Sequence, residues 1–158
     1  MFKVQELTNE VFAPYGTFFN IHEGYDEGVI SFQADRMPHF IGLPAMDSVC
    51  SIRIRYRPLE LTLTEYHNGC EEVFGGFNCD LAFHVGLMDN SNKPIMDSIK
   101  VFRLPAGTFA RVKRRVLHHA GFVINKNDVG DGIVLLPPWT YTVDCSVIEF
   151  TAPISFEA

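Results

Sequence analysis

The sequence contains no apolar run approaching the ~20 residues of a membrane-spanning helix, so we expect no association with a membrane. It has no basic stripe either, and its net charge of −6 argues against nucleic acid as a partner. The residues after Met1 include no apolar segment typical of a signal peptide, and the four cysteines form no C-x-x-C pair. These absences predict a cytoplasmic protein with reduced thiols.

Internal repeats and low-complexity tracts are also missing, and an ordinary globular composition remains. Hydrophobic residues make up 47% of the 158 residues and aromatic residues 13%, which allows a sizeable core without disulfide bonds. The length fits one domain, so we expect residues 1–158 to form a single unit.

Alternation of apolar and polar residues dominates the chain from residue 49 onward and predicts β-strands. In the first of these strands Ile52 and Ile54 face one way, and the other face carries Arg53, Arg55 and Arg57. About eight such segments follow one another at short intervals. This spacing is typical of a sandwich or of a small barrel that encloses one ligand.

The chain before residue 49 is less regular. Thr8 is a good N-cap, and Pro14 soon ends any helix, so we expect a short helix near residues 8–13. We interpret residues 16–47 as a strand or two inside long loops. The predicted fold class is therefore all-β with minor α.

Two polar residues extend the apolar face of the strand that ends at His67. On that face Leu61 and Leu63 are followed by Glu65 and His67. A buried carboxylate and imidazole are unfavourable unless they are paired or bind a metal. Glu72 then completes the pattern E-x-H-x4-E, whose oxygen and nitrogen atoms suit a first-row divalent metal. The alternative is a strand end that faces water.

A second candidate segment runs from residue 109 to 119, and its alternation predicts one long strand. The more apolar face would carry Arg114 and His118 into the interior. An inward arginine needs an anionic partner, either a small carboxylate ligand or an acidic residue of the protein. A β-bulge would turn His119 inward in place of His118, so both histidines are candidates.

Two further polar features are weaker candidates. His84 alternates away from the apolar residues of its strand, and we interpret it as a structural residue that faces the interior or solvent. The arginines at positions 53, 55 and 57 form a ladder that is most often a solvated face, although one of them can reach a site.

The order of these motifs resembles the cupin superfamily, whose members are double-stranded β-helix barrels with one metal or ligand site inside. The pattern E-x-H-x4-E is similar to the first cupin motif, with Glu65 in place of its first histidine. Pro105-Ala106-Gly107 is similar to the start of the second motif. Ala110 stands where that motif usually has a histidine, which His118 or His119 would have to replace.

Within the cupins, the chain resembles the ureidoglycolate lyase family. The resemblance is carried in order by Leu7–Gly16, by Glu65–Phe74, and by Lys113-Arg114 followed by Leu117-His118-His119. The family patterns for the last two stretches are E-R-H-x-x-x-(S/T)-Q-x-F, and His-Arg followed by W-H-H. The chain departs from these patterns at Tyr66, Glu72, Lys113 and Leu117, where the family has Arg, Gln, His and Trp.

This resemblance implies cleavage of ureidoglycolate to glyoxylate and urea, with proton transfer to and from side chains. The implied roles are acid–base chemistry at His118, His119 and Lys113, carboxylate binding at Arg114 and Arg55, and metal binding at Glu65, His67 and Glu72. We expect a divalent metal such as Zn, Ni or Mn, no organic cofactor, a small anionic substrate and a homodimer. The alternative is a cupin enzyme, or a non-enzymatic binding protein, for another small carboxylate or sugar acid.

Overall fold

The structure is a computed structural model that describes residues 1–22 and 48–158, and it confirms the predicted all-β fold. The part of the irregular region at residues 23–47 lies outside the described residues. The strands are β1 (Phe2–Gln5), β2 (Gly16–Asn20), β3 (Ser48–Arg55), β4 (Glu60–Tyr66), β5 (Glu72–Gly75), β6 (Leu81–Gly86), β7 (Lys100–Leu104), β8 (Thr108–Val112), β9 (Leu117–His118), β10 (Phe122–Val123), β11 (Val129–Leu136) and β12 (Ser146–Glu157). The helices are α1 (Asn9–Phe12), α2 (Thr140–Val143) and the 3₁₀ turn Met96–Ser98.

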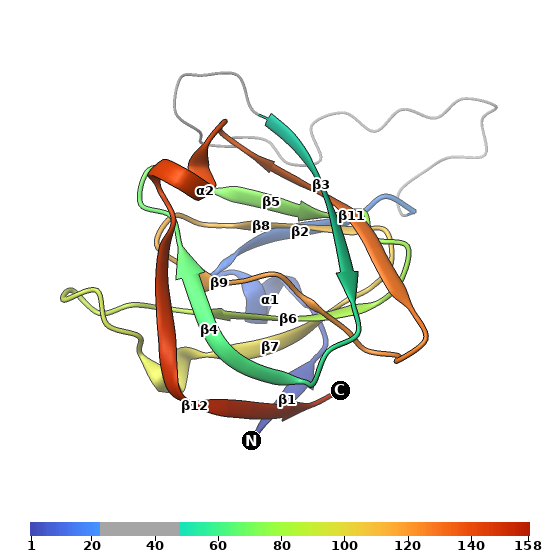
Figure 1. Cartoon of the computed structure of the whole chain (residues 1–158), viewed down its shortest axis with the longest axis horizontal. Coiled ribbons are helices and arrows are strands. Elements are labelled where there is room, and N and C mark those ends of the chain that lie inside the picture. The colour runs from blue at the N-terminus through green and yellow to red at the C-terminus, as the bar shows by residue number, and fades with distance from the viewer. Residues whose placement is uncertain (23–47) are drawn as a thin grey trace.

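Two sheets make up the molecule (Figure 1). One sheet has the order β10-β6-β7-β1-β12-β4-β9, and because β9 also pairs with β6, six of its strands close into a barrel. The other sheet has the order β2-β8-β5-β11-β3. Closure removes the free edges of the six strands, which otherwise invite pairing with other chains.

The main core lies between the two sheets. Phe74 and Val112 of the five-stranded sheet belong to the same buried cluster as Phe83 and Phe102 of the barrel. Helix α1 adds Phe12, whose ring meets those of Phe83 and Phe102 edge-on at centroid distances of 5.8 and 5.5 Å. Such edge-to-face contacts add to the stabilisation that burial provides. A second cluster, with Leu61, Ala82, Val101 and Phe156 among its members, lies on the other face of β6 and β7.

The helix expected near residues 8–13 is α1, and its N-terminus is capped as the sequence predicts. The hydroxyl oxygen of Thr8 accepts a hydrogen bond from the backbone N–H of Val11 at 3.3 Å. None of the helices in the described part of the chain is long and apolar enough to cross a membrane.

The prediction of one long strand from 109 to 119 is wrong. Strand β8 ends at Val112, and a turn follows in which the N–H of Val116 donates to the carbonyl of Lys113. Arg115 adopts a left-handed φ of 63°, which a strand does not contain, and its N–H donates to the carbonyl of His67. The alternation therefore restarts at β9, and Arg114 is exposed instead of pointing inward.

The number of strands was also underestimated. The sequence predicts about eight, and the described residues form twelve. Strands of two residues, such as β9 and β10, are too short to display an alternating pattern. Their pairing with β4 and β6 is what defines them as strands.

Candidate metal centre and acid–base pair

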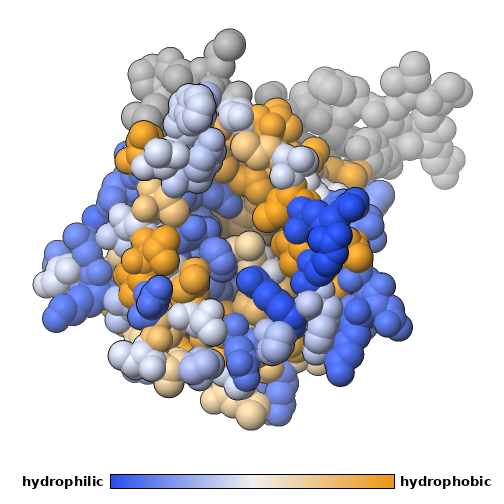
Figure 2. All heavy atoms as spheres, viewed as in Figure 1, coloured by the Kyte–Doolittle hydropathy of each residue, from blue (hydrophilic) through white to orange (hydrophobic). Residues whose placement is uncertain are grey.

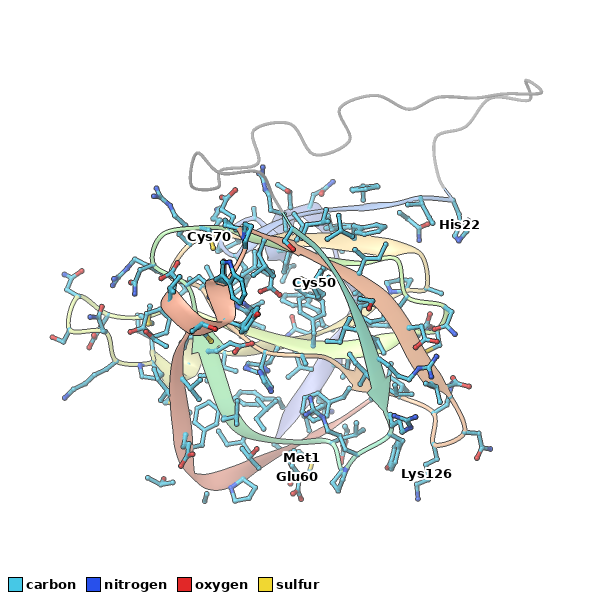
Figure 3. The ribbon with its side chains drawn as sticks, turned by 45° about the horizontal axis from the view of Figure 1, so that its top comes forward. Met1, His22, Cys50, Glu60, Cys70 and Lys126 are labelled. Carbon is cyan, nitrogen blue, oxygen red and sulfur yellow. The ribbon has the colours of Figure 1, made fainter. Side chains whose placement is uncertain are left out.

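Three side chains with metal-ligating atoms converge where β4 ends and β5 begins. They are His67, Glu72 and His118, and their ligand atoms all lie within 4.8 Å of one another. His67 follows β4, Glu72 is the first residue of β5, and His118 lies on β9, which pairs with β4. Figure 3 marks the two ends of β4, with Glu60 at its start and Cys70 shortly after its end, near α2.

The backbone fixes the protonation of both histidine rings. Nδ1 of His67 lies 2.6 Å from the carbonyl oxygen of Asp144, and Nδ1 of His118 lies 2.8 Å from that of Val116. A carbonyl oxygen only accepts, so each Nδ1 carries a hydrogen and each Nε2 of a neutral ring presents a lone pair. Such bonds at the outer nitrogen are the usual support of metal-binding histidines.

Both Nε2 atoms point at the same carboxylate oxygen. Oε2 of Glu72 lies 3.1 Å from Nε2 of His67 and 3.5 Å from Nε2 of His118. In the described part of the chain, the buried Nε2 of His118 has no hydrogen-bond partner. Three lone-pair atoms cannot meet in a buried space without a proton or a cation between them.

The pKa values show how strongly this group attracts positive charge. Burial by itself would raise the pKa of Glu72, but the neighbouring His118 and His67 outweigh it and lower this pKa to about 2. Burial would also lower the pKa of His118, but the Glu72 carboxylate outweighs it and raises this pKa. The Glu72 carboxylate therefore favours a positive charge between itself and the two rings, which a proton or a divalent cation can supply.

A second polar group lies beside the first. Nδ1 of His119 donates to Oε1 of Glu65 at 3.0 Å, and the thiol of Cys145 donates to Oε2 at 3.1 Å. Burial would raise the pKa of Glu65, but these two hydrogen bonds and nearby histidine charge lower it. Burial and the Glu65 carboxylate raise the pKa of Cys145 to about 12, so this thiol stays protonated and is no nucleophile.

A cavity of about 160 Å³ joins the two groups. Its polar wall consists of Glu65, Glu72 and His119, and its other walls are formed by Ile52, Ile54, Phe74, Phe77, Ala120, Gly121 and Val134. Figure 2 shows the hollow between β3 and β4, with hydrophobic side chains above it and strongly hydrophilic ones beside it. At about 30 Å³ per water molecule, the cavity holds roughly five waters or a molecule of a few heavy atoms.

The chain matches none of the protein-family models with which it was compared, and no curated protein matches it.

The segment after α2 lies far from β4 in sequence, yet it supports His67 and the turn that leads to Glu72. The Asp144 carboxylate accepts hydrogen bonds from the backbone N–H groups of Asn68 and Gly69 at 2.9 and 2.8 Å, and its carbonyl accepts from His67. These bonds fix the turn between His67 and Glu72. The sequence analysis missed Asp144 and Cys145, because no local pattern indicates that residues so far from β4 return to it.

His84 holds β9 in place from within the closed barrel. The Thr64 hydroxyl donates to the carbonyl of His118 at 3.1 Å, so it must accept from Nε2–H of His84 at 2.9 Å. Nδ1 of His84 then carries no hydrogen, and this buried atom has no hydrogen-bond partner in the described part of the chain. Burial accordingly lowers the pKa of His84 to about 3, and the ring is neutral.

The structure does not bring all of the predicted site residues to the cavity. Lys113 is exposed and donates through Nζ to the carbonyls of Ala13 and Pro14. Arg114 and Arg55 are exposed and do not line the cavity. His67, Glu72 and His118 form one group, whereas Glu65 pairs with His119.

Proposed function

We propose that this protein is a metal-dependent enzyme of the cupin type that performs acid–base chemistry on a small anionic substrate. His67, Glu72 and His118 would hold a divalent metal such as Zn, Ni or Mn, and Glu65 with His119 would transfer the proton. The observation that carries the proposal is the convergence of the Nε2 atoms of His67 and His118 on one carboxylate oxygen of Glu72, at 3.1 and 3.5 Å, in a buried space where Nε2 of His118 has no hydrogen bond within the described residues. Two imidazoles and a carboxylate are a donor set that these metals accept.

The arrangement of Glu65 and His119 favours an enzyme over a structural metal site. Nδ1–H of His119 is held by the carboxylate, so its Nε2 has a free lone pair, and the ring lines the cavity. A carboxylate in this position orients the imidazole and stabilises the imidazolium that forms when Nε2 takes a proton. A structural site would not need such a base beside an open cavity.

Cleavage of ureidoglycolate, the reaction implied by the family resemblance, can be written with these residues. Nε2 of His119 removes the proton of the substrate hydroxyl, and the oxygen forms the aldehyde C=O of glyoxylate. The C–N bond breaks, and the imidazolium returns the proton to the departing urea nitrogen. When bound, the metal would polarise the hydroxyl or the carboxylate of the substrate.

The apolar walls of the cavity favour a second candidate, another small carboxylate with a hydrocarbon part. Ile52, Phe74 and Val134 offer no side-chain hydrogen bonds to a urea group. A polar group buried there without partners costs about 1–3 kcal/mol. A substrate whose apolar end meets these walls would avoid this cost.

Metal analysis combined with a substrate panel tests the proposal. We expect about one metal ion per chain, turnover of ureidoglycolate or of another small carboxylate, and loss of the metal in Glu72→Gln. The matched variant His119→Gln should keep the metal and lose about 10²–10⁴-fold in rate. Purified protein with neither bound metal nor turnover of any member of the panel would refute the proposal.

A further inference from the structure

We propose that Arg57, in a cleft next to the cavity, binds the carboxylate of the substrate. This assignment rests on the proposed function, because it places a substrate group relative to the acid–base pair. It also replaces Arg114 and Arg55, which the sequence analysis favoured and which lie exposed.

The cleft and the cavity share His119 as a lining residue. The cleft has a volume of about 210 Å³ and is lined by Arg57, Pro58, Glu60, Thr62, Leu63, His119 and Phe122. His119 lines both spaces, so a molecule in the cleft lies against the ring that we propose as the base. Glu60, the other charged residue in the cleft, is exposed.

Arg57 carries a partly buried charge without a counter-ion. Its Nη2 donates to the carbonyls of Ala120 and Gly121 at 2.6 and 3.0 Å, and its guanidinium lies 4.0 Å from the ring centroid of Phe122. Within residues 1–22 and 48–158 no carboxylate forms an ion pair with it, and its buried Nε has no hydrogen-bond partner. Burial lowers its pKa, which an anion in the cleft would offset.

The contacts of Arg57 hold its guanidinium in one orientation. The two carbonyls and the Phe122 ring fix the side chain, so little conformational entropy remains to be lost when a ligand binds. A planar guanidinium matches the geometry of a carboxylate, and Nη1 makes no hydrogen bond within the described residues. A single arginine beside a small cleft suits a monoanion better than a phosphate, which usually needs several cations.

The backbone contacts also relate Arg57 to the base. Ala120, which accepts from Arg57, directly follows His119 in the chain. A carboxylate on this arginine would therefore lie near His119, which also lines the cavity. The predicted orientation is carboxylate in the cleft and reacting group in the cavity.

Binding of acetate to the protein freed of metal with EDTA tests this assignment without any turnover. The chemical shifts of the Arg57 Nε–H and of the His119 ring are followed by NMR as acetate is added, with acetamide as the neutral probe. We expect saturable shifts with acetate and none with acetamide. Arg57→Gln should weaken acetate binding at least about tenfold. Arg53→Gln removes the same charge from the outer face of β3 and should change binding by less than about twofold.

Three results would overturn the assignment. They are equal shifts with acetamide, no saturable shift of the Arg57 Nε–H in the wild-type protein, and unchanged acetate binding by folded Arg57→Gln. If Arg57→Gln does not fold, the wild-type titration still decides the question, and Arg57→Lys should bind acetate more weakly than the wild type. Acetate binding without bound metal or turnover would preserve the anion site and refute the proposed enzyme. Metal binding and turnover together with any of these three results would preserve the proposed enzyme and refute the anion site.

Discussion

Replacement of His84 by Gln tests the buried hydrogen-bond chain that supports β9. Burial lowers the pKa of His84 from 6.5 to about 3, whereas in the unfolded chain it returns to the ordinary value. The unfolded state therefore binds more protons below pH 6.5. The stability of the fold is complete above that pH and falls progressively as the pH drops toward 3. Glutamine can donate to Thr64 in the same way but does not titrate.

The expected size of the effect follows from this shift. One pKa unit corresponds to about 1.4 kcal/mol, and between about pH 7.5 and 4.5 the unfolded His84 gains nearly a full proton that the folded ring does not accept. The wild-type protein should therefore lose about 3 kcal/mol of unfolding free energy over this range through His84 alone. Acidic groups elsewhere also lower the unfolding free energy as the pH falls, but they do so equally in the wild type and in His84→Gln.

Urea denaturation of both proteins in EDTA, followed by circular dichroism at several pH values, measures the difference. The free energy of unfolding of His84→Gln relative to wild type should rise by about 3 kcal/mol between about pH 7.5 and 4.5. A difference that stays constant over this range would mean that His84 takes up its proton in the fold as readily as in the unfolded chain. The hydrogen-bond chain deduced for Thr64 would then be wrong.

The remaining predictions concern the metal group and the core. A divalent metal at about a hundred times its Kd should stabilise the wild type by about 2.7 kcal/mol and so raise its Tm. Glu72→Gln should show no such rise in Tm. An equal rise in both proteins would mean that the metal binds elsewhere. Asp144→Ala should weaken metal binding about 10–100-fold by calorimetry, because it releases the turn after His67; unchanged affinity would contradict this support role. Phe12→Ala should lower the unfolding free energy by about 3–5 kcal/mol in urea, since this ring is fully buried; a loss under about 1 kcal/mol would mean that α1 is not part of the core.

Local patterns predicted the parts of the site that lie close together in sequence. Ile54 is buried and Arg53 exposed, as the alternation along β3 indicates. His67 and Glu72 stand on either side of one turn, so their spacing of five residues places them together with little help from the rest of the fold. Of the two histidines that the sequence left open, His118 is the buried one, and it lies on β9, which starts after a turn and not as a continuation of β8.

Alternation failed where strands end. Arg57 shares the pattern of Arg53 but lies two residues beyond the end of β3, where the chain turns and the side chain packs on Phe122. Arg114 lies in the turn after β8 and is exposed for the same reason. Period two describes side-chain direction only while the backbone stays extended, and a sequence does not mark the last extended residue sharply.

The closeness of His67 and Glu72 thus follows from sequence, because their spacing across one turn is a local property. The different partners of His118 and His119 do not follow from sequence, because they depend on which acceptors the fold brings to each ring. The carbonyl of Val116 and the carboxylate of Glu72 hold His118 beside His67, whereas Glu65 holds His119 at the cavity. Asp144 and Cys145 reach the same site because β12 pairs with β4, and such long-range pairing is decided by the packing of the whole barrel.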